Sequence, residues 1–248
     1  MSMQILAEQP RADEPEVVAS APSVPPLSGS TPRAGAPPKP LLRGVSHQVA
    51  FFVALAATAM LVMSCETRAG ALASLVFGAS LSTLLGTSAM YHRVDWTPAA
   101  RMRMRRMDHA AIFVLTGGGY TPLFALVAHP KGGHGALALI WIGASVGIVK
   151  SLAWARAPKW VTAGVCVVIG WLGIAEVLAR VSVVGATCVG LLFAGGVTFS
   201  IGAVVYALKR PNPWPRVFGY HEIFHLLVIV ASGFLFAHVA FVIRAVAG

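Results

Sequence analysis

The sequence predicts an all-α, polytopic membrane protein built as a bundle of seven transmembrane helices. Of its 248 residues, 56% are hydrophobic and only 11% are charged, and the mean hydropathy is +0.74. A water-soluble domain of this size does not need such a composition. Seven apolar stretches follow residue 43, each about the 20 residues that a helix needs to cross the hydrocarbon core of a bilayer.

Residues 1–43 differ in composition from the rest and are predicted to form a disordered tail. They are rich in proline, alanine, serine and glycine, and they carry four acidic side chains, Glu8, Asp13, Glu14 and Glu16. Such a segment buries too little apolar surface to fold alone. It also lacks the basic start and apolar core of a secretory signal, so we expect the tail to lie in the cytosol.

Residues 44–246 are predicted to form the transmembrane domain. The expected helices cover residues 44–64, 70–91, 109–127, 135–154, 160–178, 183–206 and 220–242. The connections between them are short, so we expect no large domain outside the membrane. The absence of such a domain argues against a protein ligand captured outside the cell.

The positions of lysine and arginine predict the orientation, because cytosolic loops carry an excess of these residues. With the N-terminus in the cytosol, fifteen of the 19 Lys and Arg residues fall on the cytosolic side, whereas four fall outside, Arg68, Lys131, Arg180 and Arg244. Seven crossings then place the C-terminus outside. The net charge of +10 therefore reflects orientation, and we expect no nucleic-acid partner.

Four ionisable side chains are predicted to lie at one depth near the cytosolic boundary. His92 ends the second helix, Asp108 opens the third, and His221 and His225 lie in the first turns of the seventh. Ionisable groups in or beside membrane helices are costly and usually mark a function. Their common depth on three helices predicts a polar cluster assembled by the bundle, and the residue types suggest a metal site.

Local spacing supports a metal site. His221 and His225 are four residues apart, so they project from one helix face and can reach one ion, and Ser88 and His92 share this spacing. A catalytic zinc usually has three protein ligands and a fourth position for water, and three histidines fit that number. Two helical histidines four apart are, taken alone, equally compatible with a structural role.

At these residues the chain resembles the hemolysin III and progestin/adiponectin receptor family of seven-helix membrane proteins. The family has a serine four residues before a histidine at the end of helix 2, an aspartate opening helix 3 ahead of a Gly, Tyr, Thr, Pro segment, and two histidines in helix 7. Here these marks are SAMYH, DHAAIFVLTGGGYTP and HEIFH, in the same order. The resemblance covers about residues 40 to 246.

The resemblance implies a zinc ion held by His92, His221 and His225, with Asp108 contacting the water on the metal and Ser88 supporting the site from behind the ligands. It also implies a location in the cytoplasmic (inner) membrane of a bacterium. Relatives of the family resemble membrane ceramidases, which hydrolyse a lipid amide with a similar set of residues. We therefore expect Asp108 and Ser88 to be catalytic and membrane lipids, such as a ceramide-like substrate, to be the partners.

An alternative interpretation comes from HEIFH, which also satisfies the zinc-protease pattern HExxH. It would make Glu222 the general base of an intramembrane metalloprotease. This interpretation leaves His92 and Asp108 unexplained, and the sequence has no second, aspartate-bearing ligand motif. Glu222 is better interpreted as an interfacial residue or as a partner that orients a ligand imidazole.

Three classes of function remain open from the sequence. The first is a zinc-dependent hydrolase of lipid amide or ester bonds, in which every site residue has a role. The second is a membrane receptor or regulator of membrane lipid state whose zinc is structural. The third is a pore-forming cytolysin, which the sequence supports little because no continuous polar face lines the helices.

The remaining histidines and the cysteines receive structural interpretations. His238 is rotated away from the face of His221 and His225, and His109 points about 100° away from Asp108. His47, at the inner end of the first helix, has the right depth to neighbour the site or a lipid headgroup. The three cysteines, Cys65, Cys166 and Cys188, have no CxxC spacing and are expected to be reduced thiols.

Overall fold

The computed structural model describes residues 40–128 and 135–247, and within them seven spans are long and apolar enough to cross a membrane. The chain is an integral membrane protein, and the predicted seven-helix architecture is confirmed. The predicted tail, apart from residues 40–43, and Lys131 lie outside the described residues. The helices are α1 (Val45–Met63), α2 (Arg68–Arg93), α3 (Pro98–Leu126), α4 (Gly135–Ala153), α5 (Lys159–Trp171), α6 (Ile174–Leu178), α7 (Val181–Leu208) and α8 (Tyr220–Ala247).

The third helix begins at Pro98, well before the predicted start at residue 109. The side chain of Thr97 caps this end by accepting a hydrogen bond from the Ala100 backbone N–H, and Pro98 occupies the first helical turn, where its missing N–H costs nothing. The arginines between residues 101 and 106 lower the hydropathy of this stretch, so the sequence pattern did not indicate that the helix begins so early. As a result, Arg101 and Arg105 lie on the same helix as Asp108.

The fifth span, Lys159–Leu178, is a single crossing interrupted between α5 and α6. Beyond this break, the buried Arg180 side chain forms an ion pair with Glu176 at 3.1 Å and donates a hydrogen bond to the Val127 carbonyl oxygen at 3.1 Å. Burial of a guanidinium requires such partners. This contact ties the turn after α6 to the end of α3.

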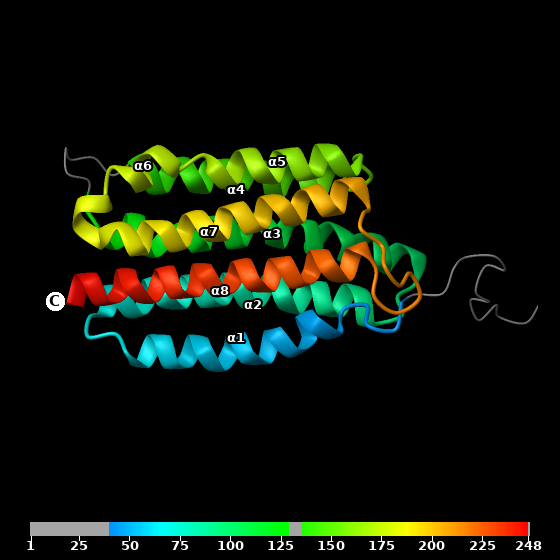
Figure 1. Cartoon of the computed structure of the whole chain (residues 1–248), viewed down its shortest axis with the longest axis horizontal. Helices are drawn as coiled ribbons and strands as arrows, with labels where there is room; N and C mark the ends of the chain where they lie inside the picture. The colour runs from blue at the N-terminus through cyan, green and yellow to red at the C-terminus, as the bar shows by residue number, and fades with distance from the viewer. Residues whose placement is uncertain (1–39, 129–134, 248) are drawn as a thin grey trace, which may run out of the picture. The chain divides into compact units, whose positions relative to one another are not determined.

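Helix α8 packs against α7, α1, α2 and α3 (Figure 1). The core here contains fully buried side chains from α2, α3 and α8 itself, including Phe77, Leu123 and Val239. The contact between α2 and α3 is close at Gly118, where a Cβ atom would lie 2.2 Å from Ser80 Oγ. The glycines in the middle of α3 therefore serve close packing, as small residues do at membrane helix interfaces.

The start of α1, the α2–α3 connection and the α7–α8 connection lie at the same end of the bundle (Figure 1). The backbone N–H of Leu41 donates to Arg216 O at 3.1 Å, so the residues before α1 are tied to the α7–α8 connection. The Arg43 guanidinium forms an ion pair with Glu222 in the first turn of α8. These contacts gather the starts of α1 and α8 and the end of α2 around one place, where the candidate site lies.

Candidate metal centre

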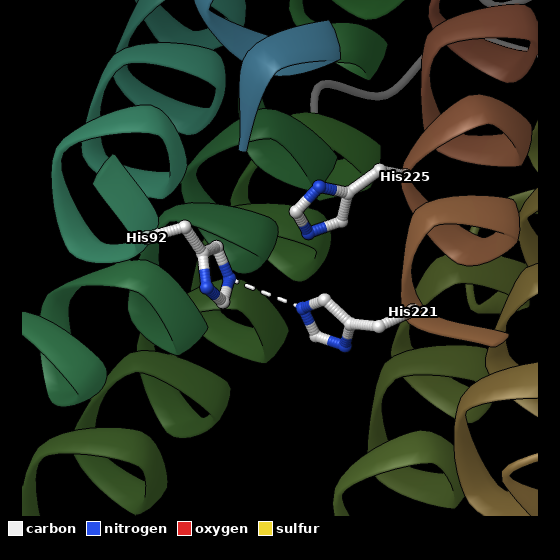
Figure 2. A group of neighbouring side chains, drawn as sticks. All are labelled: His92, His221 and His225. Atoms are coloured by element: carbon white, nitrogen blue, oxygen red, sulfur yellow. Dashed lines mark hydrogen bonds between the residues drawn. The ribbon is translucent and has the colours of Figure 1, made fainter. Parts of the chain in front are cut away.

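Three histidines meet where the end of α2 faces the start of α8. Figure 2 shows the imidazole rings of His92, His221 and His225 pointing into the same space from these two helices. One possible ligand atom from each residue lies within 4.8 Å of the others. The Nε2 atoms of His92 and His221 are 3.1 Å apart, close to the roughly 3.3 Å expected for two nitrogens bound tetrahedrally to one zinc ion at about 2.05 Å.

The chemistry of this cluster fits a transition-metal ion. All three donors are imidazoles, which suit zinc and its neighbours. His92 and His225 are buried, and His225 Nδ1 has no hydrogen-bond partner among the described residues. Buried polar nitrogens are normally satisfied, so the three histidines could hold a metal ion, as the sequence predicted.

Backbone geometry explains why the cluster is compact. The i, i+4 spacing of His221 and His225 puts both rings on one face of α8. Gly44, just before α1, has a φ of 79° and packs directly on His92, where an added Cβ atom would lie 2.7 Å from His92 Cβ. Only glycine accommodates both the left-handed backbone and this approach.

Asp108 and Ser88 lie beside the histidine cluster but not within it. Ser88, one turn before His92 on α2, is buried and lies near the Asp108 carboxylate of α3. Both residues line the same cavity as the three histidines. The structure therefore brings all five predicted site residues to one cavity, with Asp108 available to a group bound next to the histidines.

The cavity has a volume of about 400 Å³ and extends from the histidine end into the bundle. Polar and charged side chains line one end, whereas the deeper part is lined largely by apolar side chains such as Leu115, Val167, Ile174 and Leu192. A volume of this size is typical of small-molecule sites. The gradient from polar to apolar suits a ligand with a polar head and a hydrocarbon chain.

Several residues outside the predicted set of five lie around the site, and the sequence had indicated only His47 as a possible neighbour. The ring of His47 stacks on His225, and Tyr206 Oη lies 3.5 Å from His109 Nε2. Lys159 Nζ donates a hydrogen bond to Tyr220 Oη at 2.9 Å. The depth of His47 was a usable signal, whereas the tyrosines and Lys159 reach the site through helix rotations that spacing alone does not specify.

The Glu222 carboxylate is engaged by two partners. It forms the ion pair with Arg43 and accepts a hydrogen bond from the Gly219 backbone N–H at 2.8 Å, which caps the start of α8. Glu222 is not among the residues that line the cavity. This environment gives Glu222 a role in attaching α1 to α8 and does not favour the general base of the HExxH interpretation.

His238 and the cysteines lie apart from the cluster. His238 is fully buried, and its Nδ1 atom lies 2.9 Å from the Cys188 carbonyl oxygen and 3.3 Å from Cys188 Sγ. All three cysteines are free thiols, as expected. His238 thus joins α8 to α7, in agreement with the structural role that its helical position predicts.

The fold and the histidine cluster define an integral membrane protein of seven spans with a site able to hold a metal ion. A family model for haemolysin-III related proteins matches residues 36–236. Hemolysin-3 of Bacillus cereus is 26% identical over 204 residues, 81% of this chain and 90% of that protein. A Hemolysin-3 homolog of Bacillus subtilis (strain 168) is 26% identical over 206 residues, 81% of this chain and 92% of that relative. The chain belongs to the haemolysin-III related family.

The geometry predicts that purified protein binds one divalent transition-metal ion per chain. His225→Ala should weaken metal binding by at least about 100-fold, because it removes one of three imidazole donors. Metal content and affinity are measured by elemental analysis and chelator competition. His238→Gln, on the same helix but away from the cluster, should bind metal like the parent. Equal metal content in His225→Ala and the parent would contradict the assignment.

Proposed function

We propose that the protein is a zinc-dependent hydrolase that cleaves an acyl amide or ester bond of a membrane lipid. In this proposal the site lies at the cytosolic face of a bacterial cytoplasmic membrane. One observation carries the proposal: the histidine cluster and the Asp108–Ser88 pair stand at the polar end of a cavity whose depth is apolar. A lipid can place its scissile carbonyl at the polar end and its acyl chain in the apolar part.

Zinc is the metal that the donor set favours. Three imidazoles leave a fourth tetrahedral position open, which is the pattern of catalytic rather than closed structural sites. A bound zinc ion supplies Lewis-acid chemistry, since it polarises a carbonyl and lowers the pKa of water. The proposed ligands are His92, His221 and His225.

Asp108 is the proposed proton carrier. Its carboxylate accepts a proton from the attacking water as the water oxygen adds to the acyl carbon, and it returns the proton to the departing nitrogen or oxygen as the old bond breaks. Ser88 lines the cavity beside Asp108, and in this proposal its hydroxyl donates to the carboxylate and fixes its orientation. The apolar wall beyond Ile112 keeps bulk water from the acyl chain.

The cavity does not favour a pore. Its deep part is lined by apolar side chains such as Leu115, Leu192 and Val228, which give ions no substitute for their hydration. A receptor or regulator with structural zinc accounts for the histidines, but it gives Asp108 and Ser88 no role. A zinc-dependent hydrolase of lipid amide or ester bonds, ceramidase-like in its set of site residues, is therefore the function that uses the whole site.

Replacement of Asp108 tests the proposal. Asp108→Asn should retain zinc and lower the release of fatty acid from labelled ceramide or phospholipid by about 10² to 10⁴-fold, because the amide cannot carry the proton. Glu222→Gln should retain most of the turnover. The reverse pattern would support the protease interpretation, and intact zinc without turnover on a broad panel of lipids would support a structural zinc.

A further inference from the structure

Four cationic side chains line the histidine end of the cavity, from three separate parts of the chain. They are Arg43 before α1, Arg101 and Arg105 on α3, and Lys159 at the start of α5. Asp108 is the one acidic residue among the described residues that line the cavity. The polar end therefore carries an excess of positive charge, which a bound divalent metal would increase.

The order of residues on α3 arranges this charge along the cavity. Arg101, Arg105, Asp108, Ile112 and Leu115 recur every three or four residues on one helix face, and all of them line the cavity. At 1.5 Å per residue, Arg105 lies about 4.5 Å and Arg101 about 10 Å before Asp108 along the axis, whereas Ile112 lies about 6 Å beyond it. Along α3, the lining of the cavity therefore changes from cationic side chains to the Asp108 carboxylate and then to apolar side chains.

Two other arginines of the same stretch do not take part. Arg103 and Arg106 are exposed and do not line the cavity, although they belong to the same run of basic residues. A basic cytosolic boundary is expected of any membrane protein. The alternation between cavity-facing and outward-facing arginines separates a binding role from this general preference, and it supplies matched controls.

Lys159 is held in place by neutral partners. Its Nζ atom donates to Tyr220 Oη and lies 4.3 Å from the centre of the Tyr206 ring and 4.7 Å from that of Tyr220. These contacts orient the ammonium group without neutralising its charge. Arg43, in contrast, is paired with Glu222. Asp108 offsets part of the charge of Arg105, so the excess positive charge of the three side chains Arg101, Arg105 and Lys159 is set against one carboxylate.

We infer that the substrate is an anionic glycerophospholipid whose phosphate binds between Arg101, Arg105 and Lys159. The inference rests on the proposed hydrolase function. Phosphate and acyl ester are joined by a three-carbon glycerol, so a phosphate at this cationic end leaves the ester carbonyl near the histidines and the acyl chain in the apolar depth. The uncharged head of a ceramide would leave the cations without a counter-charge.

The corresponding reaction is ester hydrolysis. Water adds to the acyl carbon, the bond from that carbon to the glycerol oxygen breaks, and the glycerol oxygen receives the proton that Asp108 took from the water. The products are a fatty acid and a lysophospholipid. The phosphate stays bound to the glycerol and remains in the cationic end throughout.

Binding of short-chain lipids to the full-length protein in neutral detergent tests the inference without any turnover. With the metal removed by EDTA, dioctanoyl phosphatidylglycerol should bind at least about 10-fold more tightly than dioctanoylglycerol, since each charge-assisted hydrogen bond contributes measurably. Arg105→Gln and Lys159→Gln should each remove most of this preference. Arg103→Gln and Arg106→Gln should leave it unchanged, and Lys159→Arg should retain it.

Equal affinity for the charged and uncharged lipids would overturn the inference, and so would an equal loss in the Arg103→Gln control. Inorganic phosphate that competes as strongly as the phospholipid would show an anion site without lipid recognition, which also overturns it. Because binding is measured without metal or hydrolysis, its outcome is separate from that of the proposed activity. A protein that binds the anionic lipid but never cleaves it would contradict the hydrolase and the lipid's role as substrate, while the phosphate-binding site would stand.

A second inference comes from His47, which approaches the cluster from α1. Its ring stacks on that of His225 with centroids 4.0 Å apart and planes inclined by 11°. His47 Nε2 lies 3.3 Å from the His225 carbonyl oxygen, to which it donates, and the side chain is only 2% exposed. The His225 ring is therefore bounded by His47 on one side and by the other two histidines.

The geometry points to His47 as a positioning residue that fixes the ring orientation of His225. A stack with nearly parallel planes restricts rotation of the His225 ring, and the hydrogen bond attaches α1 to the backbone of α8 at that residue. Partners that orient ligand imidazoles raise metal affinity by about 10 to 100-fold. His47 belongs to a helix that contributes none of the three proposed ligands.

Cobalt binding tests this role. His47→Ala should weaken cobalt binding by about 10 to 100-fold and alter the visible spectrum of the bound ion, whereas His47→Phe, which keeps an aromatic stack, should fall between His47→Ala and the parent. Thr58→Ala, at another buried position of α1, controls for general loosening of the helix. An unchanged affinity and spectrum in His47→Ala would overturn the role, even if that variant were less stable.

Discussion

The meeting of α2 and α8 at three imidazoles is the constraint on which the rest of the site depends. His92 Nε2 and His221 Nε2 approach to 3.1 Å, and the stacked pair of His225 and His47 lies immediately behind them. Polar rings gathered in an apolar bundle need partners. A metal ion would satisfy several nitrogens at once and join the second span to the last.

The surrounding chain maintains this meeting point from both ends of the bundle. Near the site, the Arg43–Glu222 ion pair and the glycine that packs on His92 hold the start of α1 against α8 and α2. At the other end, buried Arg180 ties the turn after α6 to Val127 at the end of α3. Between these ends, one face of α3 passes from arginine to Asp108 and then to apolar residues. The same helix that positions the carboxylate therefore defines the polarity of the cavity.

The sequence predicted the seven spans well, because hydropathy reports membrane helices directly. It also grouped five residues that the structure brings to one cavity, because polar residues at one depth stand out against an apolar background. His92, Asp108 and His225 could be grouped from depth alone. The start of α3 was missed because its arginines lower the hydropathy of a stretch that is nevertheless helical. The stack of His47 on His225 and the pairing of Glu222 with Arg43 depend on how helices rotate and pack, and the sequence does not specify this.

The central claim is that three imidazoles hold a zinc ion with one position left open for chemistry. X-ray absorption at the zinc edge of the purified full-length protein tests it most directly. The account predicts a four-coordinate ion with three imidazole nitrogens and one oxygen at about 2.0 Å, without sulfur. A protein that binds no zinc, a sulfur ligand at about 2.3 Å, or a shell with no imidazole scattering would contradict it.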